Sequence, residues 1–283
     1  MISRIILSHR RHGAGPAPVL LLHGFLGSGR NLGGLARRLA AGDPGLSVIA
    51  LDLTGHGSSP PLPSGANVAP PGADVAPKGA DLATLAGDVL ATADALGLRA
   101  PVPIVGHSLG GRVALRAASL APQRIANVVL LDIGPSGVLS TETARVVELL
   151  LAAPPSGSRE TFRGHFRSGG LDDAVVEWLM LNLVAADGQY RWAIDRAALA
   201  ALHARTSAED LWGVVEGQGL LHLTCLRGGR SGYVTDADAA RLAAAGRRLV
   251  TIEGAGHFLH VERPAEVLAA VRDALTSRAP PPG

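Results

Sequence analysis

Short apolar runs that alternate with stretches of helical periodicity constrain the fold of this chain more than any other feature. The runs cover residues 19–22, 48–51, 102–105, 128–131, 220–226 and 249–252. Each run is short and almost uniformly apolar, which suits a strand covered on both faces rather than a strand with one face in water. Repeated strand–helix units of this kind predict an α/β fold around a mostly parallel sheet.

Residue types that favour helix ends support this prediction. They are Asn31 before a helix over 32–41, Asp81 before 82–96, Pro264 in the first turn of 265–275, and the capping-box pair Thr206 and Glu209 before 211–215. An Asn, Asp or Thr side chain can accept a hydrogen bond from a free N–H of the first turn, and proline lacks the N–H that this turn leaves unpaired. We therefore expect helices to begin at these positions.

Two segments interrupt the alternation. Residues 60–80 are rich in Pro, Gly and Ala and repeat the pattern Gly-Ala-x-Val-Ala-Pro, a composition that can bury little surface. We interpret them as a flexible insertion. Residues 135–219 have several helical patterns and no obvious strand, which predicts a helical cap inserted into a core formed by 1–134 and 220–283.

The composition excludes several classes of protein. The 283 residues are 47% hydrophobic, enough for a large core, yet no apolar run approaches the roughly 18 residues of a membrane span. The 26 basic and 24 acidic residues give a net charge of +2 and are spread along the chain. We therefore expect a cytoplasmic protein without nucleic acid as a partner and without stable membrane insertion. The single cysteine, Cys225, excludes an internal disulfide and is expected to be buried.

The motif Gly106-His107-Ser108-Leu109-Gly110 lies directly between the predicted strand 102–105 and a helical pattern over 109–121. A strand that turns at once into a helix strains the serine backbone, needs small neighbours, and presents the hydroxyl at the end of the sheet. Ser108 is therefore the predicted nucleophile.

A serine hydroxyl needs a neighbouring base, and histidine titrates in the useful range. His257 follows the last predicted strand and precedes the last helix, which places it on a loop at the same edge of the sheet as Ser108. We predict that His257 is the general base and that His260, about one helical turn further on, is structural.

Acyl transfer also requires an oxyanion hole, in which two backbone N–H groups converge on the developing charge. Leu109, at a helix N-terminus just after the nucleophile, can supply one of them. Phe25, in the loop after strand 19–22, can supply the other. We expect His23 to support this loop, and the loop 52–58 after the next strand to brace the site.

With these motifs in place, the sequence resembles the α/β-hydrolase superfamily, and within it the small esterases and thioesterases that include bacterial acyl-CoA esterases. The resemblance rests on His23-Gly24-Phe25, Asp52…Gly55-His56-Gly57, Gly106-His107-Ser108-Leu109-Gly110, Gly254-Ala-Gly-His257, Asn31-Leu32-Gly33, Leu131-Asp132-Ile133-Gly134-Pro135 and Tyr233-Val234. It implies an α/β-hydrolase fold: a mostly parallel eight-stranded sheet with helices on both faces, a helical cap, no cofactor, and acyl transfer to water.

The acid of the triad departs from the pattern of many relatives. Gly232 stands where they have an aspartate, and the nearby Asp236 and Asp238 are typical of first-turn helix residues, where carboxylates favour the dipole. Asp132 is the better candidate. It ends the strand 128–131, which the family's topology makes the neighbour of the strand that ends at Ser108, and the chain order of serine, acid and histidine fits the superfamily. Asp236 and Asp238 remain the alternatives.

These observations predict a serine hydrolase that cleaves carboxylic esters or thioesters of small to medium acyl groups through an acyl-enzyme. No metal-ligand cluster or phosphate-binding loop appears, so neither a metal nor another cofactor is expected. A C–C bond hydrolase, a cofactor-free haloperoxidase and a non-catalytic ligand-binding homologue remain open, as do the acyl length and the oligomeric state. Five cap aromatics could line an acyl pocket or form the core of the cap: Phe162, Phe166, Trp178, Trp192 and Trp212.

Overall fold

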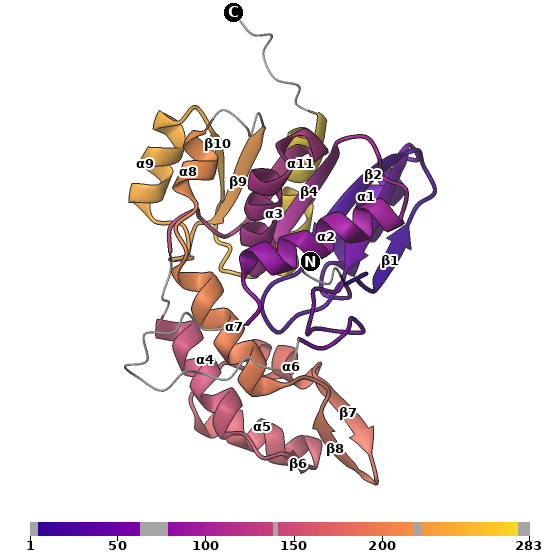
Figure 1. The fold of residues 1–283 in the computed structure, drawn as a ribbon. Helices are drawn as coiled ribbons and strands as arrows, with labels where there is room; N and C mark the ends of the chain where they lie inside the picture. Colours follow the sequence, from indigo (N-terminus) through magenta and orange to yellow (C-terminus); the bar gives the residue numbers. More distant parts are fainter. Residues whose placement is uncertain (1–4, 63–78, 138–140, 218–221, 277–283) are drawn as a thin grey trace, which may run out of the picture.

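The computed structural model describes residues 5–62, 79–137, 141–217 and 222–276. Most of the predicted flexible insertion at 60–80 lies outside the described residues. Two groups of elements are visible in Figure 1: a central sheet flanked by helices, and a smaller group of helices and short strands beyond one edge of that sheet.

The central sheet has seven strands within the described ranges, in the order β1-β3-β2-β4-β5-β9-β10. All neighbouring pairs are parallel except β1 with β3. The predicted mostly parallel sheet is thus confirmed, although the resemblance implied eight strands. The strands are β1 (His9–His12), β2 (Ala17–Leu22), β3 (Leu46–Leu51), β4 (Val102–His107), β5 (Ile125–Leu131), β9 (Leu223–Gly228) and β10 (Arg248–Ile252).

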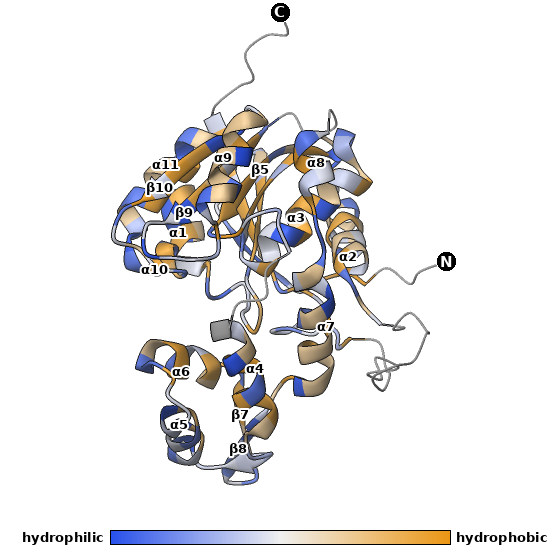
Figure 2. Cartoon of the chain, turned by 90° about the vertical axis from the view of Figure 1, so that its left-hand side faces the viewer, coloured by the Kyte–Doolittle hydropathy of each residue, from blue (hydrophilic) through white to orange (hydrophobic). Residues whose placement is uncertain are grey.

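Five of the six predicted strands could be recognised because both of their faces are largely buried, whereas β10, at the other edge of the sheet, is mostly half-buried. Along β2, Leu20 and Leu22 pack into the core on one face of the sheet, whereas Val19 and Leu21 pack into the core on the other. Strand β1 was missed because it lies at the edge of the sheet and all four of its residues are polar, so the sequence shows neither an apolar run nor an alternation of polar and apolar residues there. Figure 2 shows the hydrophobic strands lying between helices that carry both hydrophilic and hydrophobic residues.

Helices cover both faces of the sheet. Helices α1 and α11 contact each other on one face, and α2 and α3 contact each other on the opposite face. The core helices are α1 (Gly33–Gly42), α2 (Leu82–Ala95), α3 (Leu109–Leu120), α8 (Trp212–Glu216), α9 (Asp236–Ala244), α10 (Leu259–Glu262) and α11 (Pro264–Thr276), with a short 3-10 helix, η1 (Pro122–Arg124).

Two of the predicted helix starts are confirmed and two are wrong. Asp81 accepts a hydrogen bond from the backbone N–H of Thr84, and Pro264 is the first residue of α11. Asn31 does not cap α1, because its side chain instead accepts a hydrogen bond from Ser28 N in the preceding turn.

The predicted capping box at Thr206 also fails. Thr206 lies inside the last turn of α7 (Arg196–Ala208), where its hydroxyl donates to the carbonyl of Leu202 at 2.9 Å. The backbone N–H of Trp212, at the start of α8, donates instead to the side chain of Asp210.

The cap lies between β5 and β9 in sequence and beyond one edge of the sheet in space (Figure 1). Its elements are α4 (Thr141–Ala152), β6 (Ser156–Gly157), α5 (Arg159–Ser168), α6 (Asp173–Met180), β7 (Leu183–Ala186), β8 (Gln189–Trp192) and α7. The expectation of helices alone is therefore corrected by a three-stranded antiparallel sheet, β6-β8-β7. Asp187 and Gly188, both with positive φ, form the tight turn between β7 and β8.

The two linkers that join cap and core lie side by side, because the backbone N–H of Leu211 donates to the carbonyl of Pro135 at 2.9 Å. Arg112, on α3, holds both linkers. Its guanidinium donates to carbonyls on the outgoing linker, Gly134 at 3.3 Å and Ser136 at 2.7 Å. It also donates to the carbonyl of Thr206, in the last turn of α7, and to that of Glu209, on the returning linker. Burial lowers the pKa of Arg112 to about 10.

Candidate active site

The turn between β4 and α3 brings Ser108 to the end of the sheet. Its φ of 50° is positive, a conformation that few non-glycine residues adopt. A Cβ added at Gly106 would lie 2.4 Å from the backbone of Gly110, and one added at Gly110 would lie 2.3 Å from the carbonyl oxygen of Leu22. Close backbone packing therefore explains why small residues flank Ser108, and the strained turn matches the expectation from the sequence.

His257 and Asp132 meet at the same edge of the sheet. His257 follows β10, Asp132 follows β5, and the imidazole Nδ1–H donates to Asp132 Oδ2 at 2.8 Å. Because a carboxylate only accepts, this contact leaves the other ring nitrogen, Nε2, as the acceptor in the neutral imidazole. Ser108 and His257 line the same cavity.

The carboxylate of Asp132 is fully buried and accepts further hydrogen bonds. The backbone N–H of Gly228 donates to Oδ1 at 2.8 Å, and the Ser231 hydroxyl donates to Oδ2. These donors offset the cost of burying the charge. The sequence analysis missed the contact of Ser231, and nothing local to that residue signals it, because it depends on the packing of the loop after β9 against the end of β5.

The alternative acids, Asp236 and Asp238, have other partners. Asp236 is exposed at the start of α9 and pairs with Arg227 at 2.7 Å. Asp238 forms a capping box with Thr235 and accepts a hydrogen bond from the hydroxyl of Ser136. Of the three candidate carboxylates, Asp132 is therefore the one in contact with His257.

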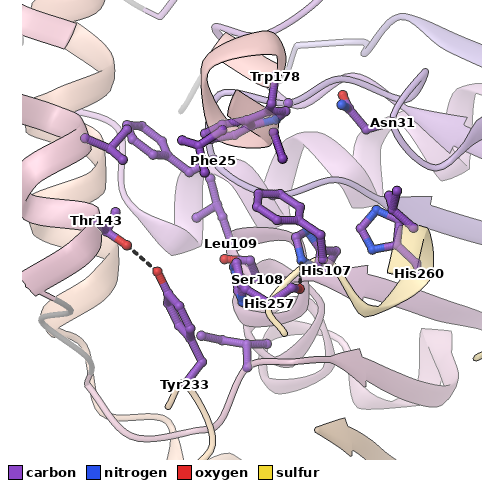
Figure 3. A pocket seen from close by; sticks show the side chains of 18 of the residues that line it. Phe25, Asn31, His107, Ser108, Leu109, Thr143, Trp178, Tyr233, His257 and His260 are labelled. Atoms are coloured by element: carbon purple, nitrogen blue, oxygen red, sulfur yellow. Dashed lines mark hydrogen bonds between the residues drawn. The ribbon is translucent and has the colours of Figure 1, made fainter. Parts of the chain in front are cut away.

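The loop after β2, in which the sequence analysis expects an oxyanion-hole donor, lies close to Ser108. A Cβ added at Gly24 would lie 3.2 Å from Ser108 Cβ, so glycine permits this approach. Phe25, next in the chain, and Leu109, the first residue of α3, both line the cavity beside Ser108 (Figure 3). The cap also holds this loop, because the side-chain amide of Asn182 donates to the carbonyl of Leu26 at 2.9 Å.

Buried histidines support the loops around Ser108. His23 donates from Nδ1 to the carbonyl of Gly24 at 2.7 Å and accepts from the backbone N–H of Leu53 at 2.9 Å. Burial lowers the pKa of His23 to about 4, so it remains neutral. Asp52 braces the neighbouring loop by accepting hydrogen bonds from Gly29 N and Ser58 N. The structural roles expected for His23 and the loop 52–58 are confirmed.

Buried His107 lies in a cluster with His257 and His260, which are both half-buried. The Nε2–H of His107 donates to the backbone carbonyl of His257 at 2.9 Å, and its ring centroid lies 4.6 Å from that of His260. Burial lowers the pKa of His260 to about 4 and holds the pKa of His107 well below its usual range. Neutral His107 thus fixes the loop that carries His257, a role that the sequence analysis did not anticipate.

A cavity of about 360 Å³ lies between the core and the cap. Of the five aromatic residues in the predicted cap segment 135–219, Trp178 lines the cavity and the other four pack elsewhere, Trp212 among them on the core helix α8. Phe162 and Phe166 are fully buried against Trp192, and Trp212 is buried on α8. Most of the cavity wall is apolar and includes Ile133, Val146, Val175, Trp178, Leu181, Phe258 and Val261.

Across the described part of the chain, no group of three or more His, Cys, Asp or Glu side chains is arranged to hold a metal ion. Cys225 is buried as expected, and burial raises the pKa of its thiol. None of the helices in the described ranges is both long and apolar enough to cross a bilayer.

The fold and the site together define a class of protein: a hydrolase with a doubly covered parallel sheet, a serine on the strand-to-helix turn, and a histidine and a carboxylate on later loops at the same sheet edge. The chain belongs to the alpha/beta hydrolase family, whose model matches residues 19–271.

Relatives and solved structures extend this likeness over nearly the whole chain. Lipase LipV of Mycobacterium tuberculosis is 32% identical over 289 residues, covering 97% of this chain and 99% of the relative. Esterase YbfF of Escherichia coli is 27% identical over 264 residues, covering 90% of this chain and 92% of the relative. The structure of a marine microorganism esterase superposes with a TM-score of 0.79 at 24% identity, covering 95% of this chain and 99% of the other.

Proposed function

We propose that this protein is a serine esterase that hydrolyses carboxylic esters or thioesters of small to medium acyl groups through an acyl-enzyme, without a cofactor. The observation that carries the proposal is the 2.8 Å hydrogen bond from His257 to Asp132 at the sheet edge where Ser108 lies on its strained turn. The names of the relatives, an esterase and a lipase among them, support ester hydrolysis. The largely apolar cavity wall supports an acyl group as the bound part of the substrate.

In the proposed mechanism, Ser108 Oγ attacks the ester carbonyl carbon while His257 Nε2 accepts its proton. The carbonyl oxygen becomes an oxyanion, which the backbone N–H groups of Phe25 and Leu109 stabilise. His257 then protonates the leaving alcohol or thiol, and the acyl group remains on Ser108. Water then attacks the acyl carbon while His257 accepts its proton. His257 returns that proton to Ser108 Oγ as the acid leaves.

Asp132 contributes by fixing the tautomer of His257. With the proton on Nδ1 bound to the carboxylate, Nε2 is free to accept the serine proton, and the imidazolium that results is stabilised by the negative charge. The hydrogen bonds from Gly228 and Ser231 keep the carboxylate oriented for this purpose.

A fluorophosphonate probe tests the proposal directly, because it phosphonylates an activated serine hydroxyl. We expect stoichiometric labelling of the wild type and none of Ser108→Ala. The wild type should also hydrolyse p-nitrophenyl esters, whereas Ser108→Ala should not. The matched control is Ser168→Ala, at an exposed serine on α5, which should label and turn over normally.

The outcomes separate the alternatives. Labelling without turnover of p-nitrophenyl esters or acyl-CoA thioesters would favour a C–C bond hydrolase or a cofactor-free haloperoxidase on the same residues. Absence of labelling in the folded wild type would favour a ligand-binding homologue. Loss of turnover on chelation, restored by a divalent ion, would contradict a cofactor-independent mechanism.

A further inference from the structure

We propose that Tyr233 is a positioning residue for His257 and that its hydrogen bond to Thr143 makes the orientation of the imidazole depend on the cap. This inference rests on the proposed role of His257 as the general base. It concerns a contact between the loop after β9, which carries Tyr233, and the first turn of α4 in the cap.

The first observation is a ring stack. The rings of Tyr233 and His257 lie nearly parallel, with centroids 3.8 Å apart and an interplanar angle of 19°. The bond to Asp132 holds the imidazole at one point on its edge, about which the ring can still tilt. A flat ring against its face restricts that tilt. Edge and face contacts together therefore define where Nε2 points.

The second observation is that one loop serves both contacts. Ser231, two residues before Tyr233, donates to Asp132, and the backbone N–H of Tyr233 donates to the Ser231 hydroxyl at 3.3 Å. The same loop is joined to the loop of His257, because Arg230 N donates to the carbonyl of Ala255 at 2.9 Å. The carboxylate and the stacked ring thus move with the histidine as one unit.

The third observation links this unit to the cap. The Tyr233 hydroxyl is hydrogen-bonded to Thr143 Oγ1, and Figure 3 shows the phenol reaching from the core loop to the cap helix while Ser108 and His257 lie beside it. Thr143 and Tyr233 both line the cavity. A displacement of α4 would therefore pull on the ring that lies against the imidazole.

The size of the effect follows from the geometry that catalysis requires. A catalytic group displaced by about 1 Å can lose on the order of 100-fold in rate, even when the change is made outside the reacting atoms. Removal of the ring should release the imidazole, whereas removal of the hydroxyl should only loosen the ring. The two functions of Tyr233 can be separated by choice of variant.

The test measures kcat and KM on p-nitrophenyl acetate, a small activated ester. Tyr233→Leu should lower kcat about 100-fold and leave KM within about 3-fold. Tyr233→Phe and Thr143→Val should each lower kcat about 3- to 10-fold. Their double variant should be no slower than either alone, because both remove the same hydrogen bond. The matched control is Tyr190→Phe, at the second of the two tyrosines, whose ring lies beside Arg159. This variant should retain wild-type kinetics.

Three outcomes would overturn the inference: an effect of Tyr233→Leu confined to KM, a kcat within 2-fold of wild type, or additive losses in the double variant. If Tyr233→Leu does not fold, the cycle of Tyr233→Phe and Thr143→Val still decides the link to the cap. The downfield proton resonance of His257 Nδ1–H should persist in the Phe and Val variants and broaden in the Leu variant. Fluorophosphonate labelling of the wild type shows separately whether the proposed function itself holds.

Discussion

Asp132 occupies a backbone position that suits an aspartate in two respects. Its φ of 51° lies in the left-handed region, where Asp and Asn are better tolerated than other non-glycine residues. Its side chain is fully buried and accepts hydrogen bonds from Gly228, Ser231 and His257. The positive φ and the three hydrogen bonds therefore both favour Asp or Asn at this position, and of these two residues only Asp is negatively charged.

Asp132→Asn should preserve the fold, since asparagine tolerates the same φ, but should lower kcat by something on the order of 10⁴. The amide would present an N–H to His257 or force the proton onto the wrong ring nitrogen. Steady-state kinetics with circular dichroism as a check on folding measure this. Asp236→Asn, at the exposed residue, is the control and should keep its activity. A normal kcat in Asp132→Asn with a collapse in Asp236→Asn or Asp238→Asn would assign the acid to the loop after β9.

Gly106→Ala should destabilise the protein by about 1–3 kcal/mol or more, because the added Cβ would lie 2.4 Å from the backbone of Gly110, which cannot rotate away. Gly87→Ala offers the opposite case. This glycine lies inside α2, and a Cβ added to it would have no neighbouring atom within 4 Å, so alanine should stabilise by about 0.5–1 kcal/mol. Urea unfolding of the two variants measures whether each substitution lowers or raises the free energy of unfolding. Equal stability of the two proteins would contradict the packing argument.

The elements that carry the cap are joined to the core through Arg112. Its side chain is buried, and its donors satisfy carbonyls on both linkers. A buried guanidinium can do this because its planar fork offers five N–H groups, whereas an ammonium offers three. The arginine thus holds the end of the outgoing linker and the start of the returning one against the helix that begins beside Ser108.

Arg112→Lys should therefore cost about 1–3 kcal/mol, since at least one buried carbonyl loses its donor. Limited proteolysis should cut faster near residues 134–137 and 206–211, while the sheet remains folded. Arg99→Lys, at a side chain that is 77% exposed, should change stability by less than about 0.5 kcal/mol. Unchanged cleavage at the linkers of Arg112→Lys would show that other contacts hold the cap.

Strands covered on both faces could be predicted from the sequence, since their apolar runs reflect burial directly. The polar edge strand β1 and the hairpin β7–β8 could not, although Asp187-Gly188 is a recognisable turn signal. Helix caps failed where a side chain had a competing local partner, as Asn31 has in Ser28. The residue types around Asn31 do not by themselves indicate whether its side chain bonds to Ser28 or to the first turn of α1.

The site was predictable to the extent that strand ends define it. Ser108, Asp132 and His257 each follow a strand of one parallel sheet, so topology alone brings them to the same edge. Their catalytic roles stay a prediction. The contacts of Ser231, His107 and Tyr233 depend on how loops pack on one another, which no periodicity in the sequence records.

The charged form is unfavourable at five histidines, of which three are buried (His23, His56 and His107) and two are half-buried (His203 and His260). Burial lowers the pKa of His23, His203 and His260 to about 4, that of His56 to about 3, and that of His107 well below the usual value. The folded protein therefore binds fewer protons than the unfolded chain below pH 6.5. The stability that these groups contribute is complete above that pH and is lost as the pH falls toward their folded-state values.

Urea unfolding between pH 7.5 and 5 should thus show a free energy of unfolding that falls with pH, with about four to five protons taken up by these histidines on unfolding near pH 5. His56→Leu should reduce that uptake by about one proton, because its imidazole titrates in the unfolded state alone. Stability that is independent of pH over this range would contradict the burial of neutral imidazoles.

The hydrogen bond between Leu211 and Pro135 joins the two linkers into a single neck. A contiguous stretch of the gene encodes everything beyond that neck, whereas Ser108 and His257 are encoded outside it. Insertions at closely spaced chain ends leave the host sheet in register. Selection can therefore lengthen, shorten or replace the cap by recombination at two codons. A replacement cap would have to restore the hydrogen bond to Tyr233, because Thr143 lies beyond the neck.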